Sequence, residues 1–266
     1  MTNTIDAVKV GRVFFTPDSG PDIEAVTVLT LESHVGNVVK LVEKFRRDFY
    51  PTFKWHNQET HDLLIRAAQK HDEAKPETFR VTYQGWKGAD PKSLGYSFAG
   101  HRFRVFDPNL YVELLIRLHH EFSVEGIVKA QFQLSHSGFS KEKVESFLLD
   151  LYILEMCDQI EAEIETYAFT GNVQPRVFMD FHSRMLQDEK VEVTPYPFGN
   201  EDENEEIVLP LTYYQFEVSE EDRWHITKTL TGNSPQEGLN HLREMIVKAH
   251  TYTKCQRKDM ILCKAY

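Results

Sequence analysis

The dipeptide His71-Asp72 offers two kinds of metal ligand, an imidazole nitrogen and a carboxylate that can bridge two cations. It lies near the end of the segment Glu59–Lys75, whose apolar residues recur at helical spacing and which Pro76 terminates. Lys75 follows His71 by one helical turn, so its ammonium can reach an anion held by such a metal. This pattern predicts a metal site at the end of a packed helix.

Further histidines and one aspartate recur along the helical part of the chain, at or near helix ends or on helices with an apolar face. Four nitrogen or oxygen ligands from separate helices suit one transition metal, and the remaining histidines suit a second ion about 3.5–4 Å away. Taken singly, each histidine is more often a surface residue or a hydrogen-bonded core residue, so the prediction depends on the set. Its other members are His34, His101, His119, His120 and Asp158.

Several elements must position these side chains. Strand-like segments at Val8–Phe15 and Ala25–Leu31 predict an N-terminal β-hairpin, and an amphipathic helix capped by Thr30 or Ser33 is predicted over Glu32–Phe49. Asp107 as cap, with Pro108 in the first position, predicts a helix that runs to His119-His120. The longest predicted helix runs from Lys141 to about Tyr167 and carries Asp158.

The remaining segments are expected to be less regular. Thr78–Ser97 reads as a loop or a weak hairpin, and the stretch between Gly126 and Gly138 as a polar connection. Beyond Gly171, strands are predicted at Lys190–Phe198, Ile207–Val218, Arg223–Leu230 and Asp259–Tyr266, with a helix at Pro235–Tyr252. The expected fold is mainly α, with a helical domain over residues 1–170 that includes the hairpin 1–30, and a small α/β lobe over 171–266.

Bulk composition bounds the class of protein. The 266 residues are 41% hydrophobic, with a formal net charge of −11 and three cysteines without metal-ligand spacing. This charge argues against an overall basic surface that coats nucleic acid, although a metal site can supply positive charge locally. No apolar run approaches the roughly 20 residues of a membrane span. The odd cysteine count argues against a disulfide framework, and a reducing cytoplasm is therefore the expected location.

The order His, His-Asp, His, His-His, Asp resembles that of the HD superfamily of metal phosphohydrolases, and within it the HD nuclease of type I CRISPR interference. The segment around His34 is similar to the family's opening helix, and His71-Asp72 with Lys75 and Phe79 to its HD-x-x-K-x-x-x-F pattern. The resemblance covers about residues 30–165. The other matching pieces are Ser97–Arg102, His119-His120 and Leu154–Asp158.

The resemblance implies an HD-type helical bundle that hydrolyses phosphodiesters of single-stranded DNA with two divalent ions (Mn, Ni, Co, Fe or Mg). His34, His71, Asp72 and Asp158 would hold the first ion, with Asp72 bridging to a second held by His101, His119 and His120. Lys75 would stabilise charge that develops on the phosphate. The implied partners are a helicase subunit and a crRNA-guided surveillance complex, and the chain itself has no nucleotide-binding phosphate loop.

Two departures from the family pattern bear on this reading. Ala74 stands where the family often has glycine, and Glu161 and Glu163 follow Asp158 where it often has a small hydroxyl residue. Contacts with a DNA strand are expected from a basic cluster near His101 and from aromatic residues that can stack on bases. The cluster comprises Lys87, Lys92, Arg102 and Arg104, and the aromatic residues are Tyr83, Trp86, Tyr96 and Phe98.

Three hypotheses therefore stand. The first is the CRISPR-type nuclease, which the double histidine favours because one-metal HD enzymes need only His, His-Asp and Asp. The second is an HD enzyme that acts on nucleotides or other small phosphate esters in a narrower pocket. The third is a non-catalytic docking module whose histidines are structural.

Overall fold

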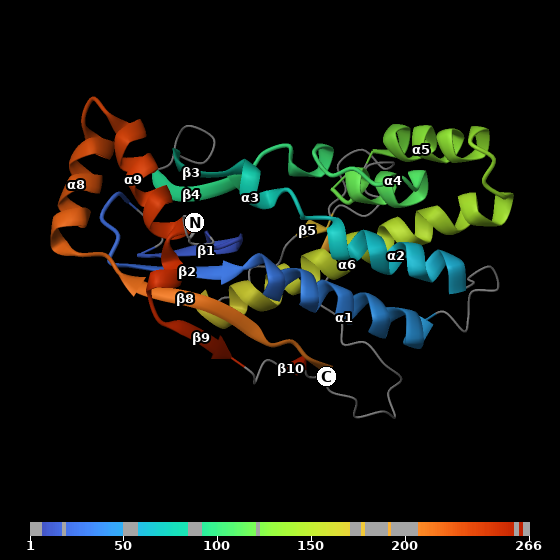
Figure 1. Ribbon diagram of the computed structural model, residues 1–266, viewed down its shortest axis with the longest axis horizontal. Helices are drawn as coiled ribbons and strands as arrows, with labels where there is room; N and C mark the ends of the chain where they lie inside the picture. The colour runs from blue at the N-terminus through green and yellow to red at the C-terminus, as the bar shows by residue number, and fades with distance from the viewer. Residues whose placement is uncertain are drawn as a thin grey trace, which may run out of the picture. The chain divides into compact units, whose positions relative to one another are not determined.

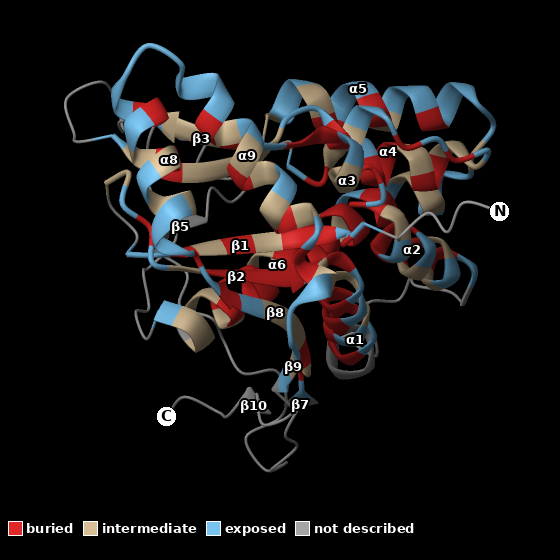
Figure 2. Cartoon of the chain, turned by 60° about the vertical axis from the view of Figure 1, so that its left-hand side comes forward, coloured by how far each residue is buried: buried red, intermediate tan, exposed pale blue. Residues whose placement is uncertain are grey.

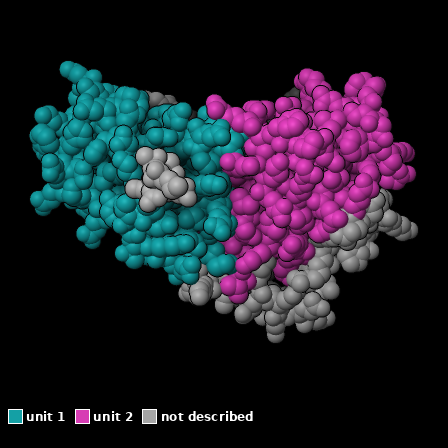
Figure 3. Space-filling view, viewed as in Figure 1, with its two compact units in different colours: residues 1–34, 74–101, 210–257 teal, residues 35–73, 102–209, 258–266 magenta. Residues whose placement is uncertain are grey.

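The computed structural model describes residues 7–17, 20–49, 58–84, 92–120, 123–170, 177–178, 191–192, 207–257 and 261–262. The chain forms two compact units (Figure 3). Unit 1 comprises residues 1–34, 74–101 and 210–257, and unit 2 comprises residues 35–73, 102–209 and 258–266. Among the described residues, no helix combines the length and the apolar character that crossing a membrane requires. The described part is mainly helical with a small sheet, as expected.

Unit 2 is built around the long helix α6 (Lys141–Thr170). Its buried residues Phe147, Leu151 and Leu154 recur every three or four positions and form one apolar face. The helices packed with it include α2 (Gln58–Lys70), α4 (Leu110–Leu118) and α5 (Val124–His136).

Polar bonds from three helices converge on α6. Tyr111 of α4 donates its hydroxyl to Asp150 at 2.7 Å in a buried position. Lys143 pairs with Glu59 of α2 at 2.6 Å. Asn37, on α1 (Leu31–Phe49), donates to Glu161 Oε1 at 3.2 Å. These bonds tie α6 to α1, α2 and α4.

The sheet of unit 1 is antiparallel, in the order β1-β2-β8-β9 (Figure 1). The predicted hairpin is confirmed as β1 (Val10–Thr16) and β2 (Ala25–Thr30). Strand β2 also pairs with β8 (Leu211–Glu217), with Val28 opposite Tyr214, and β8 pairs with β9 (Lys254–Arg257). Four of the six residues of β2 are buried (Figure 2), and this strand pairs both with β1 and with β8 from the C-terminal part of the chain.

A second hairpin and three helices complete the described part of unit 1. The hairpin pairs β3 (Phe79–Gln84) with β4 (Ser93–Phe98), so the hairpin reading of that segment is the right one. Helix α3 (Lys75–Thr78) precedes it, and α8 (Glu220–Thr231) packs on α9 (Pro235–Val247). Buried residues of the sheet, the second hairpin and this helix pair share one apolar cluster, for example Val26, Phe79, Ile226 and Leu242.

Four predicted elements differ from the structure. The helix expected over Glu59–Lys75 ends at Lys70, and Pro76 lies in the first turn of the next helix, α3. The expected polar connection between Gly126 and Gly138 is largely helix α5, capped by Ser123, whose hydroxyl accepts from Gly126 N at 3.1 Å. The expected strand Arg223–Leu230 lies within helix α8. The cap of α4 is Asn109, whose side chain accepts from Tyr111 N at 2.9 Å, and Asp107 instead accepts from Asn109 N at 2.9 Å.

The units also combine segments that the expected boundary near residue 170 separates. Strand β8 lies beyond that boundary, yet it pairs with β2 from the N-terminal hairpin. The predicted strands at 190–198 and 259–266 lie mostly outside the described residues; β6 (Val191–Glu192), β7 (Ile207–Val208) and β10 (Ile261–Leu262) fall within or beside the expected strands.

Candidate metal centre

The ends of two helices position the central histidines. Helix α2 ends at Lys70, immediately before His71-Asp72, and α4 ends at Leu118, immediately before His119-His120. The last four carbonyls of a helix have no partner within it. His71 Nδ1 lies 2.7 Å from Ala68 O, and His119 Nδ1 lies 2.6 Å from Ile116 O. Each ring therefore donates a hydrogen bond to a carbonyl near the end of a helix, where carbonyls have no partner within the helix.

These bonds also define the chemical form of the rings. A carbonyl oxygen can only accept, so Nδ1 must be the donor, and in the neutral ring Nε2 carries the lone pair. His101 is bonded in the same way, with Nδ1 2.7 Å from Phe98 O at the end of β4. Histidines that ligate metals usually donate their other ring nitrogen to a carbonyl or carboxylate. All three rings therefore offer Nε2 as the ligand atom.

Two carboxylates face these nitrogens. Asp72 places Oδ2 3.3 Å from His71 Nε2 and Oδ1 3.9 Å from His119 Nε2. Asp158 places Oδ1 3.7 Å from His71 Nε2 and Oδ2 4.0 Å from His120 Nε2. Each carboxylate thus directs its two oxygens at two different histidines, which is the arrangement expected of a bridging ligand.

Two groups of potential ligands result. His34, His71, Asp72 and Asp158 are all buried, and their ligand atoms lie within 4.8 Å of one another. The atoms of His101, His119 and His120 also lie within 4.8 Å of one another. Ligands each about 2.0–2.2 Å from one ion are separated by about 3–4 Å, so the separations of 3.3 and 3.7 Å between His71 Nε2 and the two carboxylates fit a transition ion. The buried His/Asp group can hold such an ion.

Electrostatics at His71 favour a positive charge in this group. Burial alone lowers the pKa of His71, but the adjacent carboxylates of Asp72 and Asp158 outweigh burial and raise it to about 9. A buried carboxylate pair stabilises a neighbouring cation, either a proton on the ring or a metal ion in its place. A metal ion that binds must displace that proton.

His119 and Cys157 behave differently. Burial, together with His120 and His71, holds the pKa of His119 well below its ordinary value of 6.5, so its ring is neutral at neutral pH and ready to ligate. Burial and the neighbouring Asp158 raise the pKa of the Cys157 thiol well above 9.0. This shift favours the protonated, less nucleophilic form of the thiol.

A third buried group extends along α6 from Asp158. His34, Glu161 and Glu165 have ligand atoms within 4.8 Å of one another. Glu161 is one of the departures from the family pattern, and Glu165 was not among the ligands predicted from the sequence. Spacing could have found it, because positions 158, 161 and 165 lie on one helix face. Asp158, Glu161 and Glu165 are all buried in the folded chain.

The other predicted residues lie in varied settings. Lys75 begins α3, and its ammonium lies 5.1 Å from the centre of the Phe98 ring. Lys92 lies over Tyr83 at 5.9 Å, and both line a hollow of about 530 Å³ that also includes residues of α8 and α9. Lys87 and Trp86 lie outside the described residues. Arg102 and Arg104 flank Phe103 just after His101.

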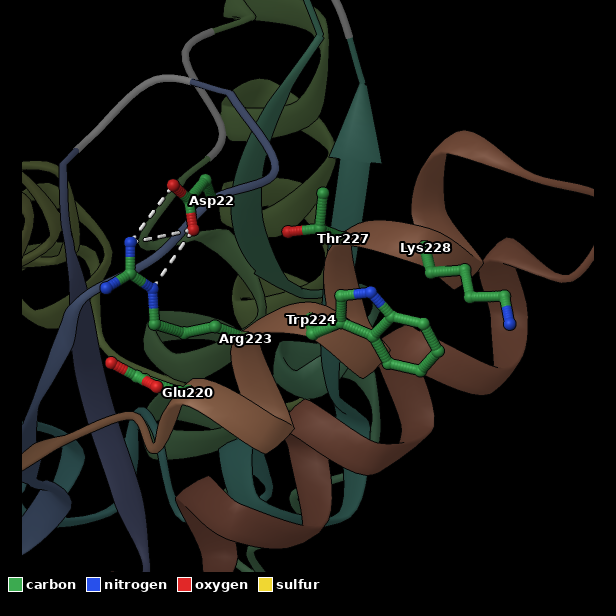
Figure 4. A pocket seen from close by; sticks show the side chains of 6 residues that line it. All are labelled: Asp22, Glu220, Arg223, Trp224, Thr227 and Lys228. Atoms are coloured by element: carbon green, nitrogen blue, oxygen red, sulfur yellow. Dashed lines mark hydrogen bonds and ion pairs between the residues drawn. The ribbon is translucent and has the colours of Figure 1, made fainter.

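A further hollow of about 440 Å³ lies along α8. Figure 4 shows Trp224 and Lys228 on this helix, together with Arg223, which pairs with Asp22 through two bonds of 3.0 Å. No predicted metal ligand is among the six residues that line it, which are Asp22, Glu220, Arg223, Trp224, Thr227 and Lys228. The described hollows are thus separate from the ligand groups.

Comparison of the chain with protein-family models, with curated proteins and with solved structures finds no match. A function can therefore be proposed only from the geometry of the two ligand groups and the resemblance of the sequence motifs.

Proposed function

We propose that the protein is a metal-dependent phosphodiester hydrolase of the HD type, which cleaves single-stranded DNA as the nuclease of a CRISPR interference system. The observation that carries this proposal is the buried group His71, Asp72 and Asp158 with His34, in which Nδ1 of His71 is committed to a carbonyl and Nε2 faces the carboxylates. The helicase and the crRNA-guided complex enter the proposal through the sequence resemblance alone.

The ligand residues would have distinct roles in such a hydrolase. Two divalent ions, when bound, would lower the pKa of water towards neutrality and offset charge on the phosphate oxygens. Asp72 and Asp158 would hold both ions, since each directs one oxygen to His71 and the other to His119 or His120. The backbone carbonyls of Ala68 and Ile116 keep the rings in one orientation and one tautomer. This preorganisation means that the ligands need not rearrange as an ion enters.

The test uses a control that the same helix provides. Helix α2 carries a second His-Asp dipeptide, His61-Asp62, in which His61 is half-buried and Asp62 is exposed. We expect His71→Ala or Asp72→Ala to abolish Mn²⁺-dependent cleavage of circular single-stranded DNA, at least a thousandfold, because each removes a ligand. His61→Ala and Asp62→Ala should retain near wild-type cleavage. Essential upstream residues with a dispensable downstream pair would contradict the proposal.

Burial of the ligands supports a second candidate, a hydrolase of nucleotides or other small phosphate esters. The side chains of His71, Asp72 and His119 are 0% exposed, whereas that of His120 is 39% exposed. His120 is thus the most exposed of these four side chains, and a site whose other ligands are fully buried favours a small substrate. Incubation of the protein with a panel of nucleotides beside single-stranded DNA separates the two candidates, since hydrolysis of nucleotides alone would identify the second.

A further inference from the structure

Two phenylalanines near the candidate metal centre are exposed. Phe103 is 59% exposed and Phe106 is 73% exposed, in the segment that directly follows His101. Burying a phenylalanine side chain typically stabilises a protein by about 1.5–3 kcal/mol. Two large apolar rings left exposed three residues apart are therefore informative, because contiguous exposed apolar surface marks interaction sites.

The segment is held in a defined shape. Val105 and Asp107 are buried and alternate with the exposed Phe106. Lys70 of α2 donates to Phe106 O at 3.2 Å and to Asp107 Oδ2 at 3.0 Å. Arg66 of α2 adds a 2.9 Å ion pair to the same carboxylate. Lys70 immediately precedes His71, so the residue that anchors the segment adjoins the ligands of the candidate centre.

Cationic side chains lie in this segment and on the helix that anchors it. The guanidinium of Arg102 lies 4.8 Å from the centre of the Phe103 ring, within the range of a cation–π contact. The one carboxylate in this segment, Asp107, is buried and paired with α2. In a chain with a net charge of −11, this is a local concentration of positive charge. We name it the arginine–phenylalanine patch, and it comprises Arg66, Lys70, Arg102, Phe103, Arg104 and Phe106.

We propose that the arginine–phenylalanine patch is a binding site for single-stranded DNA, in which Phe103 and Phe106 stack on unpaired bases and Arg102 and Arg104 contact phosphates. Exposed aromatic faces interleaved with cations are how proteins bind single strands without reading their sequence. The inference rests on the proposed function, and it names residues that would deliver a strand to the ligand group adjoining Lys70. In a duplex the bases are stacked on one another inside the helix, so they are not available to stack on Phe103 and Phe106.

The main test compares strands that have and lack bases, with metal removed by EDTA so that no cleavage occurs. Fluorescence anisotropy would measure the affinity of the full chain for oligothymidylate and for an abasic strand of equal length. We expect the wild type to bind the abasic strand at least tenfold more weakly, because base–aromatic stacking contributes about 1–3 kcal/mol per base. Equal affinity for the two strands would overturn the proposal without any variant having to fold.

Variants then locate the effect. Phe103→Ala with Phe106→Ala should weaken binding of oligothymidylate at least tenfold and leave binding of the abasic strand unchanged. Phe132→Ala is the matched control, because Phe132 is 62% exposed on α5, away from the patch in sequence, and its ring centre lies 3.8 Å from that of His136. An equal loss in the control, or no loss in the double variant, would overturn the assignment of these rings.

Salt dependence separates the rings from the arginines. Each phosphate contact to a single strand contributes about −0.7 to the slope of log affinity against log salt concentration. Arg104→Gln should therefore make the slope shallower by about 0.7, whereas the phenylalanine variants should keep the slope of the wild type. A phenylalanine variant with a shallower slope would show that it perturbs phosphate contacts, which contradicts a stacking role.

The proposed function is tested apart from this binding. Hydrolysis of bis(p-nitrophenyl) phosphate by the wild type with Mn²⁺ needs no strand-binding surface. Absence of that hydrolysis, with base-dependent binding intact, would remove the proposed function and leave a strand-binding surface. Hydrolysis together with equal binding of strands with and without bases would overturn the proposed role of the arginine–phenylalanine patch and support the proposed hydrolase function.

Discussion

At the scale of single residues, the side-chain nitrogens of the buried histidines have separate tasks. Nδ1 of His71 and of His119 satisfies the end of a helix, while Nε2 faces Asp72. The same residue thus terminates a helix and presents a ligand. His71 and His119 can fill this double role because each directly follows a helix whose last carbonyls have no partner within it.

Metal content follows from this arrangement. Replacing His119 and His120 together with alanine should lower the number of transition ions from two per chain to one, because the group they form with His101 loses two of its three ligands. Elemental analysis of the purified protein after saturation with Mn²⁺ and desalting measures this. His136→Ala is the control, since His136 also bonds a helical carbonyl, at 2.9 Å, but is exposed. A single ion in the wild type, unchanged in the double variant, would indicate a one-metal enzyme.

Residue types and their order were enough to nominate the metal ligands. His71-Asp72 and His119-His120 each follow a segment with helical periodicity, and the structure places the carboxylate of Asp72 3.3 Å from His71 Nε2 and 3.9 Å from His119 Nε2. The exposed Phe103 and Phe106 were not nominated, because an apolar residue in a short segment between elements reads as core. Only the burial of Val105 and Asp107 shows which side chains the segment turns outward.

At the scale of elements, the errors of prediction have identifiable causes. Gly126 suggested a loop, but it lies in the first turn of α5, where the Ser123 cap offsets its poor helix propensity. In Arg223–Leu230 a short polar-apolar alternation suggested a strand. The acidic first turn after the Ser219 cap and the buried pair Ile226 and Leu230, four residues apart, define helix α8 instead.

The packing of α8 on α9 depends on a glycine. A Cβ at Gly238 would lie 2.2 Å from Thr229 Oγ1, and that hydroxyl is held by the carbonyls of His225 and Ile226, each at 2.9 Å. We expect Gly238→Ala to destabilise the protein by about 1–3 kcal/mol through overpacking. Urea unfolding measures this change.

Gly36 in α1 is the matched control for that substitution. It is exposed, and a Cβ there would meet nothing within 4 Å. Gly36→Ala should stabilise the helix by up to about 1 kcal/mol, through helix propensity alone. Equal effects of the two substitutions, in sign and size, would show that α8 and α9 do not pack as closely as the structure indicates.

At the scale of the whole molecule, unit 1 draws its sheet from both ends of the chain. Strand β2 lies between β1 and β8, and β8 lies between β2 and β9. A chain shortened to residues 1–206 should leave β2 with an unpaired edge and with apolar residues such as Val26 and Val28 deprived of the cluster they share with Phe216. We expect it to associate into oligomers, visible by size-exclusion chromatography. A monomeric shortened chain with native unfolding behaviour would contradict this role of β8.

The place of β2 in the sheet also has a consequence for synthesis on the ribosome. The N-terminal hairpin emerges early, but its partner β8 is translated only after every nominated metal ligand and the whole of α6. At about 5–20 residues per second, the edge of β2 stays open for on the order of ten to forty seconds. During that interval the nascent chain already carries the complete ligand set for a metal, while the sheet beside its first helix is still missing the strand that closes it.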